Sequence, residues 1–155
     1  YVDEDFQRQM IPANVGWLSV ENAWSLLDYK MDLKTTANVF QGGTLNAFGI
    51  YAFNTSLKLF NDFGFDNIET EILSNTKYFI SKLKSIGLNC VLENCADEEL
   101  AGIITIKPKD AEKLFAELEK KKIICSLREG FIRFSQHFYN THHEIDEVLD
   151  ELYKK

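Results

Sequence analysis

The hydrophobic pattern of this chain changes from a helical repeat to short strand-like runs, and this change constrains the fold most. From Ile50 to Ile86 apolar residues recur at steps of three and four, which predicts two long helices separated at Gly64. Beyond Gly87 the apolar runs become short and partly β-branched. Only two prolines occur in 155 residues, so long regular elements are expected.

The C-terminal half is predicted to alternate short strands with helices. Asp66 is expected to cap the second long helix, Asp110 begins a further one, and Thr141 with Glu144 forms a capping box that opens the last. Four strands are predicted, at Leu88–Leu92, Gly102–Ile106, Ile123–Leu127 and Phe131–Phe134. This order predicts an α+β fold with a small, mostly antiparallel sheet and helices packed on one side.

Charge and cysteine usage exclude several classes of function. The net charge of −7 argues against binding to nucleic acid or to an anionic membrane. No apolar run approaches the roughly 20 residues that a membrane span needs. Cys90, Cys95 and Cys125 have no disulfide-framework or metal-site spacing, which predicts reduced thiols in the cytoplasm and no metal site.

Two segments together resemble a known family. The first is Phe131-Ile-Arg-Phe-Ser-Gln-His-Phe-Tyr-Asn-Thr141, followed by His-His-Glu-Ile-Asp146. The second lies upstream, at Phe40-Gln-Gly-Gly-Thr-Leu-Asn-Ala-Phe-Gly-Ile50. In this order and spacing they resemble the class V aminotransferase and cysteine desulfurase family of pyridoxal-phosphate (PLP) enzymes, and the resemblance covers essentially the whole chain.

The resemblance implies an architecture as well as an activity. Residues 1–45 would be a remnant of a large PLP-binding domain. Residues 46–155 would be the C-terminal small domain of a fold-type-I enzyme, with a long connecting helix at its start. The longer protein would use PLP on an amino-acid or oxo-acid substrate, as a homodimer with shared active sites.

Arg133 is the leading candidate for substrate binding. It lies between Ile132 and Phe134 in a predicted strand, so its side chain should point away from theirs. A buried guanidinium needs an anionic partner, and its planar fork suits a carboxylate. The alternative is an exposed arginine on a sheet face. The resemblance implies that Arg133 binds the α-carboxylate of the substrate.

Further candidates come from the Gly-Gly-Thr string and from the Arg-x-Gly element. Small residues before a helix let main-chain N–H groups approach an anion, although short strings of this kind are common and their spacing alone favours a simple loop and helix cap. The resemblance implies that Gly43, Thr44 and Asn46 bind the phosphate of the neighbouring subunit's PLP. Arg128 would lie on the substrate side, or would form a surface ion pair.

The sequence departs from the family in two places. No His-Lys pair is present, so the PLP-binding lysine is expected upstream of Tyr1, and the chain alone is expected to lack a catalytic residue, bound PLP and activity. No cysteine follows the Arg-x-Gly element, and Cys125 lies in an apolar run that suits an inert thiol. Aminotransferase, lyase or epimerase chemistry is therefore favoured over desulfuration.

Some alternatives stay open at this stage. The chain could instead be an α+β binding domain without a cofactor, or a dimerisation module built around Thr44. Trp17 and Trp24 are expected to pack in a core. His137 has no evident partner and is expected to be a packed or solvated histidine.

Overall fold

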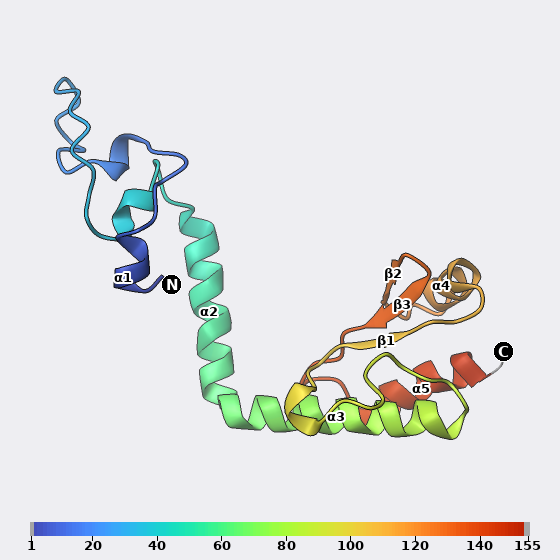
Figure 1. Ribbon diagram of the computed structural model, residues 1–155. Helices are drawn as coiled ribbons and strands as arrows, with labels where there is room; N and C mark the ends of the chain where they lie inside the picture. Colours follow the sequence, from blue (N-terminus) through green and yellow to red (C-terminus); the bar gives the residue numbers. More distant parts are fainter. Residues whose placement is uncertain (1, 154–155) are drawn as a thin grey trace. The chain divides into compact units, whose positions relative to one another are not determined.

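The computed structural model describes residues 2–153, and its contacts divide the chain into two units, Tyr1–Ser56 and Leu57–Lys155 (Figure 1). The predicted division between residues 45 and 46 remains a prediction. Unit 1 contains α1 (Glu4–Gln7) and two 3₁₀ turns, Trp17–Ser19 and Ala37–Phe40. Helix α2 (Ala47–Phe63) contains the boundary. Unit 2 continues with α3 (Phe65–Ser85), a 3₁₀ turn (Asp97–Glu99), β1 (Ile104–Ile106), α4 (Ala111–Lys120), β2 (Ser126–Arg128), β3 (Phe131–Phe134) and α5 (His142–Tyr153).

Unit 2 is an α+β fold, as the sequence predicts. Its three strands form one antiparallel sheet in the order β1-β3-β2 (Figure 1). One face of the sheet is buried, with Leu127 on β2 half-buried at its edge. Helices α3, α4 and α5, together with Cys90, supply the rest of the core on that side. The core comprises Phe79, Leu83, Cys90, Ile104, Ile106, Ala111, Leu114, Leu118, Ile132, Phe134, Ile145, Leu149 and Leu152.

The turn between β2 and β3 is the shortest that a hairpin allows. Arg128 pairs with Phe131, so only Glu129 and Gly130 connect the two strands. Both residues have positive φ, 47° and 81°, which is the backbone that a tight hairpin turn of this hand requires. The Arg-x-Gly element is therefore a structural turn, and it fixes the register of Arg128 relative to β3.

Two of the three predicted helix starts are confirmed. Asp110 Oδ1 accepts a hydrogen bond from the Lys113 main-chain nitrogen at 3.0 Å. Thr141 and Glu144 form the predicted capping box, with Thr141 N donating to Glu144 Oε2 at 2.7 Å. The prediction for Asp66 is wrong: α3 starts two residues earlier than a cap at Asp66 implies, because Gly64 adopts a φ of 95° and serves as the cap position.

The prediction of a strand at Leu88–Leu92 is also wrong. Only Cys90 pairs, with Ile106, through an isolated bridge, and the Val91 nitrogen donates to Thr105 O at 2.9 Å. The chain then turns immediately, because Glu93 and Cys95 donate back to Cys90 O and Leu92 O. A short β-branched run thus lies along the edge of β1 without becoming a strand.

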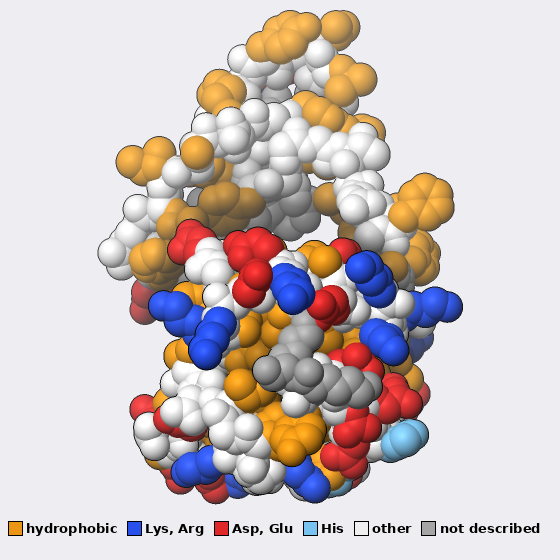
Figure 2. All heavy atoms as spheres, turned by 90° about the vertical axis from the view of Figure 1, so that its right-hand side faces the viewer, with side chains coloured by type: hydrophobic (Ala, Val, Ile, Leu, Met, Phe, Trp, Pro, Cys, Tyr) orange, Lys and Arg blue, Asp and Glu red, His pale blue; other side chains and the backbone are white. Residues whose placement is uncertain are grey.

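Unit 1 and α2 expose much of their apolar surface. The predicted core packing of Trp17 and Trp24 is wrong: they are 42% and 79% exposed and contact each other edge to face at 5.1 Å. No residue of α2 is buried. In the view of Figure 2 several hydrophobic side chains protrude from unit 1, whereas charged side chains of both signs are interspersed over unit 2. This distribution is typical of a surface that another polypeptide covers.

Candidate functional site

The face of the sheet opposite the core carries the polar residues that the sequence singled out. Arg133 on β3 is paired with Thr105 on β1 and with Ser126 on β2, so the three form one row across the sheet. A second row contains Phe131, which is paired with Arg128 and has Lys107 Nζ 5.2 Å from its ring centroid. We call this surface the arginine face; it comprises Thr105, Lys107, Ser126, Arg128, Phe131 and Arg133.

Arg133 is half-buried on this face, as its alternation with two buried neighbours predicts. Its Nε donates to Ser135 Oγ at a long 3.5 Å. No carboxylate within residues 2–153 forms an ion pair with it. Most of the guanidinium is thus available to an anion that this part of the chain does not supply. One hydroxyl-bearing residue lies on each side of Arg133, Thr105 on β1 and Ser126 on β2.

Arg128 and Lys107 accompany Arg133 and are both exposed. Within the described part of the chain, neither has an ion-pair partner. Arg128, Phe131 and Arg133 line one shallow hollow, together with Val91, Thr105, Ser126, Leu127 and Glu129. The structure therefore brings the two predicted substrate-binding arginines, Arg128 and Arg133, to one surface.

The predicted phosphate-binding residues lie in unit 1, at the start of α2. Gly42–Thr44 packs against another glycine: a Cβ on Gly16 would lie 1.8 Å from Gly42 O. Thr44 is exposed, and Asn46 Oδ1 accepts from Gly49 N at 3.0 Å and so caps the helix. An exposed hydroxyl just before the positive end of a long helix fits a phosphate.

The thiols fit a structural role. Burial raises the pKa of Cys125 and of Cys90, which favours the unreactive protonated form. Within residues 2–153 no group of three His, Cys, Asp or Glu side chains could hold a metal ion. Nor is any helix in the described residues long and apolar enough to cross a membrane.

The turn that follows β3 is held by buried polar groups. Asn75 Nδ2 donates to His137 O at 3.2 Å and to Asn140 O at 2.9 Å. The His137 ring stacks on Phe60 and Tyr139, and its Nδ1 is buried without a hydrogen-bond partner. His137 is therefore a packed histidine, one of the two outcomes expected from the sequence.

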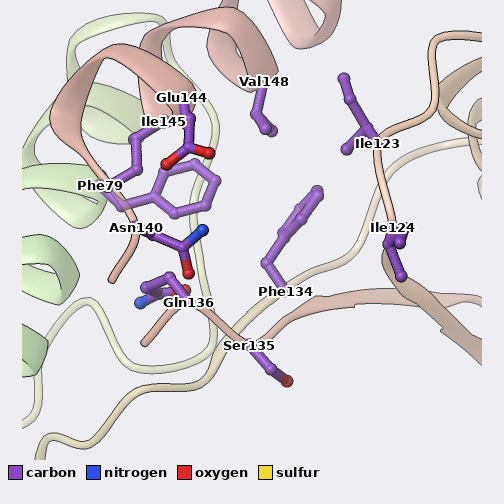
Figure 3. A pocket seen from close by; sticks show the side chains of 10 residues that line it. All are labelled: Phe79, Ile123, Ile124, Phe134, Ser135, Gln136, Asn140, Glu144, Ile145 and Val148. Atoms are coloured by element: carbon purple, nitrogen blue, oxygen red, sulfur yellow. The ribbon is translucent and has the colours of Figure 1, made fainter. Parts of the chain in front are cut away.

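A separate small cavity lies beside this turn, on the helix-covered side of the sheet (Figure 3). Its volume is about 120 Å³, and its walls include Phe79, Phe134 and Val148. The Gln136 amide at its edge donates to Thr76 Oγ1 at 2.9 Å, and that hydroxyl donates to Ala101 O. These groups join α3 to the end of β3, and none of the predicted binding residues lies there.

Sequence reasoning missed Thr105, Lys107, Ser126 and Phe131 as members of the site. The period-two alternation of Gly-Ile-Ile-Thr-Ile-Lys107 would have placed Thr105 and Lys107 on one face. The hairpin turn sets the register between β2 and β3. The register between β1 and β3, which places Thr105 opposite Arg133, has no local signature in the sequence.

Comparisons with known proteins agree with this architecture. The family model for class-V aminotransferases matches residues 1–148, and the chain belongs to that family. It is similar to the uncharacterized aminotransferase YcbU of Bacillus subtilis (strain 168), with 27% identity over 155 residues, which is 100% of this chain and 40% of YcbU. The chain thus spans less than half the length of this relative.

Solved structures with low sequence identity show the same fold. The cysteine desulfurase of Thermococcus onnurineus NA1 superposes with a TM-score of 0.86 at 20% identity, over 99% of this chain and 41% of that one. The cystine C–S lyase C-DES, solved with its product cysteine persulfide, gives 0.83 at 20% identity over the same shares. Another C-DES structure holds glycine covalently linked to PLP. The likeness covers the C-terminal part of the desulfurase fold.

Proposed function

We propose that this chain is the C-terminal part of a PLP-dependent enzyme that acts on an amino-acid or oxo-acid substrate, with Arg133 as the group that binds the α-carboxylate. The observation that carries the proposal is the state of Arg133. It is half-buried on the arginine face, has no carboxylate partner within residues 2–153, and is flanked by Thr105 and Ser126. A guanidinium in such a position is complementary to a planar carboxylate.

Gly43, Thr44 and Asn46 are the residues proposed to hold the cofactor phosphate. The Thr44 hydroxyl would donate to it, while Asn46 keeps the helix start in place. In the proposed homodimer this phosphate belongs to the cofactor of the neighbouring subunit. When bound, PLP supplies an electron sink that allows bonds at the α-carbon of an amino acid to break.

The reaction type stays open among transamination, lyase and epimerase chemistry. The lysine that binds PLP is proposed to lie upstream of Tyr1, so the chain alone would be inactive. The hairpin turn at Glu129 and Gly130 leaves no loop for a nucleophilic cysteine, which disfavours a desulfurase. The three free cysteines support a reducing, cytoplasmic setting.

The chain offers a direct test, because it contains only three arginines: Arg8, Arg128 and Arg133. The NMR signals of their Nε–H groups can be followed while L-alanine is added, with L-alaninamide as the control that lacks the carboxylate. The Arg133 signal should shift with alanine and stay still with alaninamide, and Arg8 should not respond to either. If alanine leaves Arg133 unmoved, the carboxylate role is wrong.

The cofactor is tested on a longer polypeptide that includes the expected upstream lysine. Adding PLP should produce a visible absorption band that shifts when an amino acid binds. Arg133→Ala should keep the band and abolish that shift. A longer polypeptide that gives no band in the presence of PLP would favour a binding domain without cofactor.

A dimerisation module is the second candidate, and one observation favours it. Helix α2 exposes large apolar side chains along its length, including Phe48, Tyr51, Phe53 and Leu59. Apolar surface of this extent is commonly covered by a partner polypeptide. Sedimentation of the chain over a range of concentrations separates this candidate from a monomeric module.

A further inference from the structure

The arginine face has a charge opposite to that of the whole chain. The sequence carries 24 acidic and 17 basic residues, giving a net charge of −7. Three cations nevertheless gather on this face, Lys107, Arg128 and Arg133, and none is ion-paired within residues 2–153. Elsewhere in residues 2–153, four basic residues form ion pairs with carboxylates: Arg8, Lys30, Lys77 and Lys121.

The three cations are divided between the two rows of the face. In one row Arg133 is flanked by the hydroxyl-bearing residues Thr105 and Ser126. In the other row Phe131 is paired with Arg128, and Lys107 lies over its ring. Successive residues on one face of a strand are about 7 Å apart, so the second row is about that far from the first. A single α-carboxylate occupies the guanidinium fork of Arg133. Arg128 and Lys107 in the second row are then left without an anionic partner.

We propose that the second row is a subsite for an acidic side chain, so that the substrate is an amino acid with a second anionic group, a carboxylate or a phosphate. This inference rests on the proposed role of Arg133 in binding the α-carboxylate. Arg128 binds the second anion, Lys107 adds charge, and Phe131 contacts the carbon chain between the two acidic groups. The single carboxylate lining the hollow, Glu129, follows Arg128 at the exposed turn.

The test compares matched pairs of amino acids on the 155-residue chain. L-Glutamate and L-glutamine have nearly the same size and differ in one charge, and O-phosphoserine and serine form the phosphate pair. Affinities are measured from the Arg Nε–H signals at constant ionic strength. Glutamate or O-phosphoserine should bind about fivefold more tightly than its uncharged partner, and the pair with the larger ratio identifies the acidic group.

Variants assign the effect to the second row. Arg128→Gln should remove most of the difference in affinity between the acidic amino acid and its uncharged partner. Lys107→Gln should remove part of the preference for the acidic amino acid over its uncharged partner. Lys84→Gln, which removes an exposed cation from α3, should leave this preference as it is in the unmodified chain.

The α-carboxylate role of Arg133 and the second subsite are contradicted by different results. If glutamine and serine do not shift Arg133 at all, the α-carboxylate role is wrong. If they do shift it, but glutamate and O-phosphoserine gain no affinity, the second subsite is wrong. A preference that survives Arg128→Gln would equally overturn it.

Discussion

Asn75 on α3 donates a 2.9 Å hydrogen bond to the main-chain oxygen of Asn140, 65 positions further along the chain. The same Nδ2 group donates to His137 O at 3.2 Å, so one buried amide satisfies both ends of the turn that follows β3. This turn joins the strand that carries Arg133 to the capping box of α5. Asn75 therefore connects the helix layer to the strand on which the proposed site depends.

Replacing Asn75 with alanine should destabilise unit 2. The substitution leaves two main-chain carbonyls without their donor in a partly buried position, which typically costs about 1–3 kcal/mol of unfolding free energy. Urea unfolding measures the change. Ser74→Ala is the control, because Ser74 is exposed on the same helix, and it should change stability by less than about 0.5 kcal/mol. Equal effects of the two variants would contradict a supporting role for Asn75.

Arg133→Lys should separate the shape of the cation from its charge. Lysine keeps the positive charge but loses the planar fork, so affinity for an amino-acid carboxylate should fall by about tenfold. Because Arg133 has no ion pair within residues 2–153, the fold should tolerate the change to within about 0.5 kcal/mol. NMR titration and urea unfolding measure the two quantities. A large loss of stability would mean that Arg133 is structural.

The sequence predicted the elements of unit 2 better than it predicted their environment. The α+β class, the antiparallel sheet and the caps at Asp110 and Thr141 depend on local chemistry, and the structure confirms them. The strand predicted at Leu88–Leu92 failed, because a strand also needs a continuous partner, and only Cys90 finds one. The prediction that Trp17 and Trp24 are buried was wrong for a similar reason. Burial of a side chain depends on which element packs against it, and the composition of the chain does not reveal that element.

The candidate site was predictable in part. Alternation around Ile132 and Phe134 indicated that Arg133 points away from the core, and the structure agrees. The neighbours of Arg133 across the sheet could not be read from the sequence, because register is a property of the assembled strands. The proposed contacts of Gly43, Thr44 and Asn46 with a cofactor remain predictions, since they involve a neighbouring subunit.

The stability contributed by the capping box of α5 should depend on pH. Hydrogen bonds from Thr141, first from its main-chain nitrogen, hold the pKa of Glu144 below its usual range. Because the folded pKa is lowered, this contribution is complete above the unfolded value of about 4.3 and is lost as pH falls through the folded pKa. Glu144→Gln can keep the cap but cannot titrate, so it should lose less stability between pH 7 and pH 3.

Unfolding free energies across that pH range test this prediction. Glu98→Gln serves as the control, because Glu98 is an exposed carboxylate outside α5, and it should leave the pH dependence almost as it is in the unmodified chain. An identical loss of stability in the unmodified chain and in Glu144→Gln would show that the Glu144 charge adds nothing.

Gly16 and Gly42 give a matched pair in unit 1. A Cβ at Gly16 would overlap Gly42 O at 1.8 Å, whereas a Cβ at Gly42 meets nothing within 4 Å. Gly16→Ala should therefore displace the loop before Thr44, at a cost of about 1–3 kcal/mol, and Gly42→Ala should be tolerated. Hydrogen exchange at Ser19 N, which donates to Gly16 O, should accelerate about tenfold or more in the first variant only. Unchanged exchange in Gly16→Ala would mean that this loop contact is absent in solution.

Helix α2 should drive association of the isolated chain. At about 100° per residue, its apolar side chains cover roughly half of the circumference, a wider arc than one neighbouring element usually buries. Phe48 is 92% exposed on this arc. Replacing Phe48 and Phe53 with glutamate should lower the weight-average mass seen by sedimentation at high concentration, while Asn54→Glu, on the polar side, should not. A chain that stays monomeric at all concentrations would show that this surface does not pair with a second copy, and would leave the remaining part of the fold as its partner.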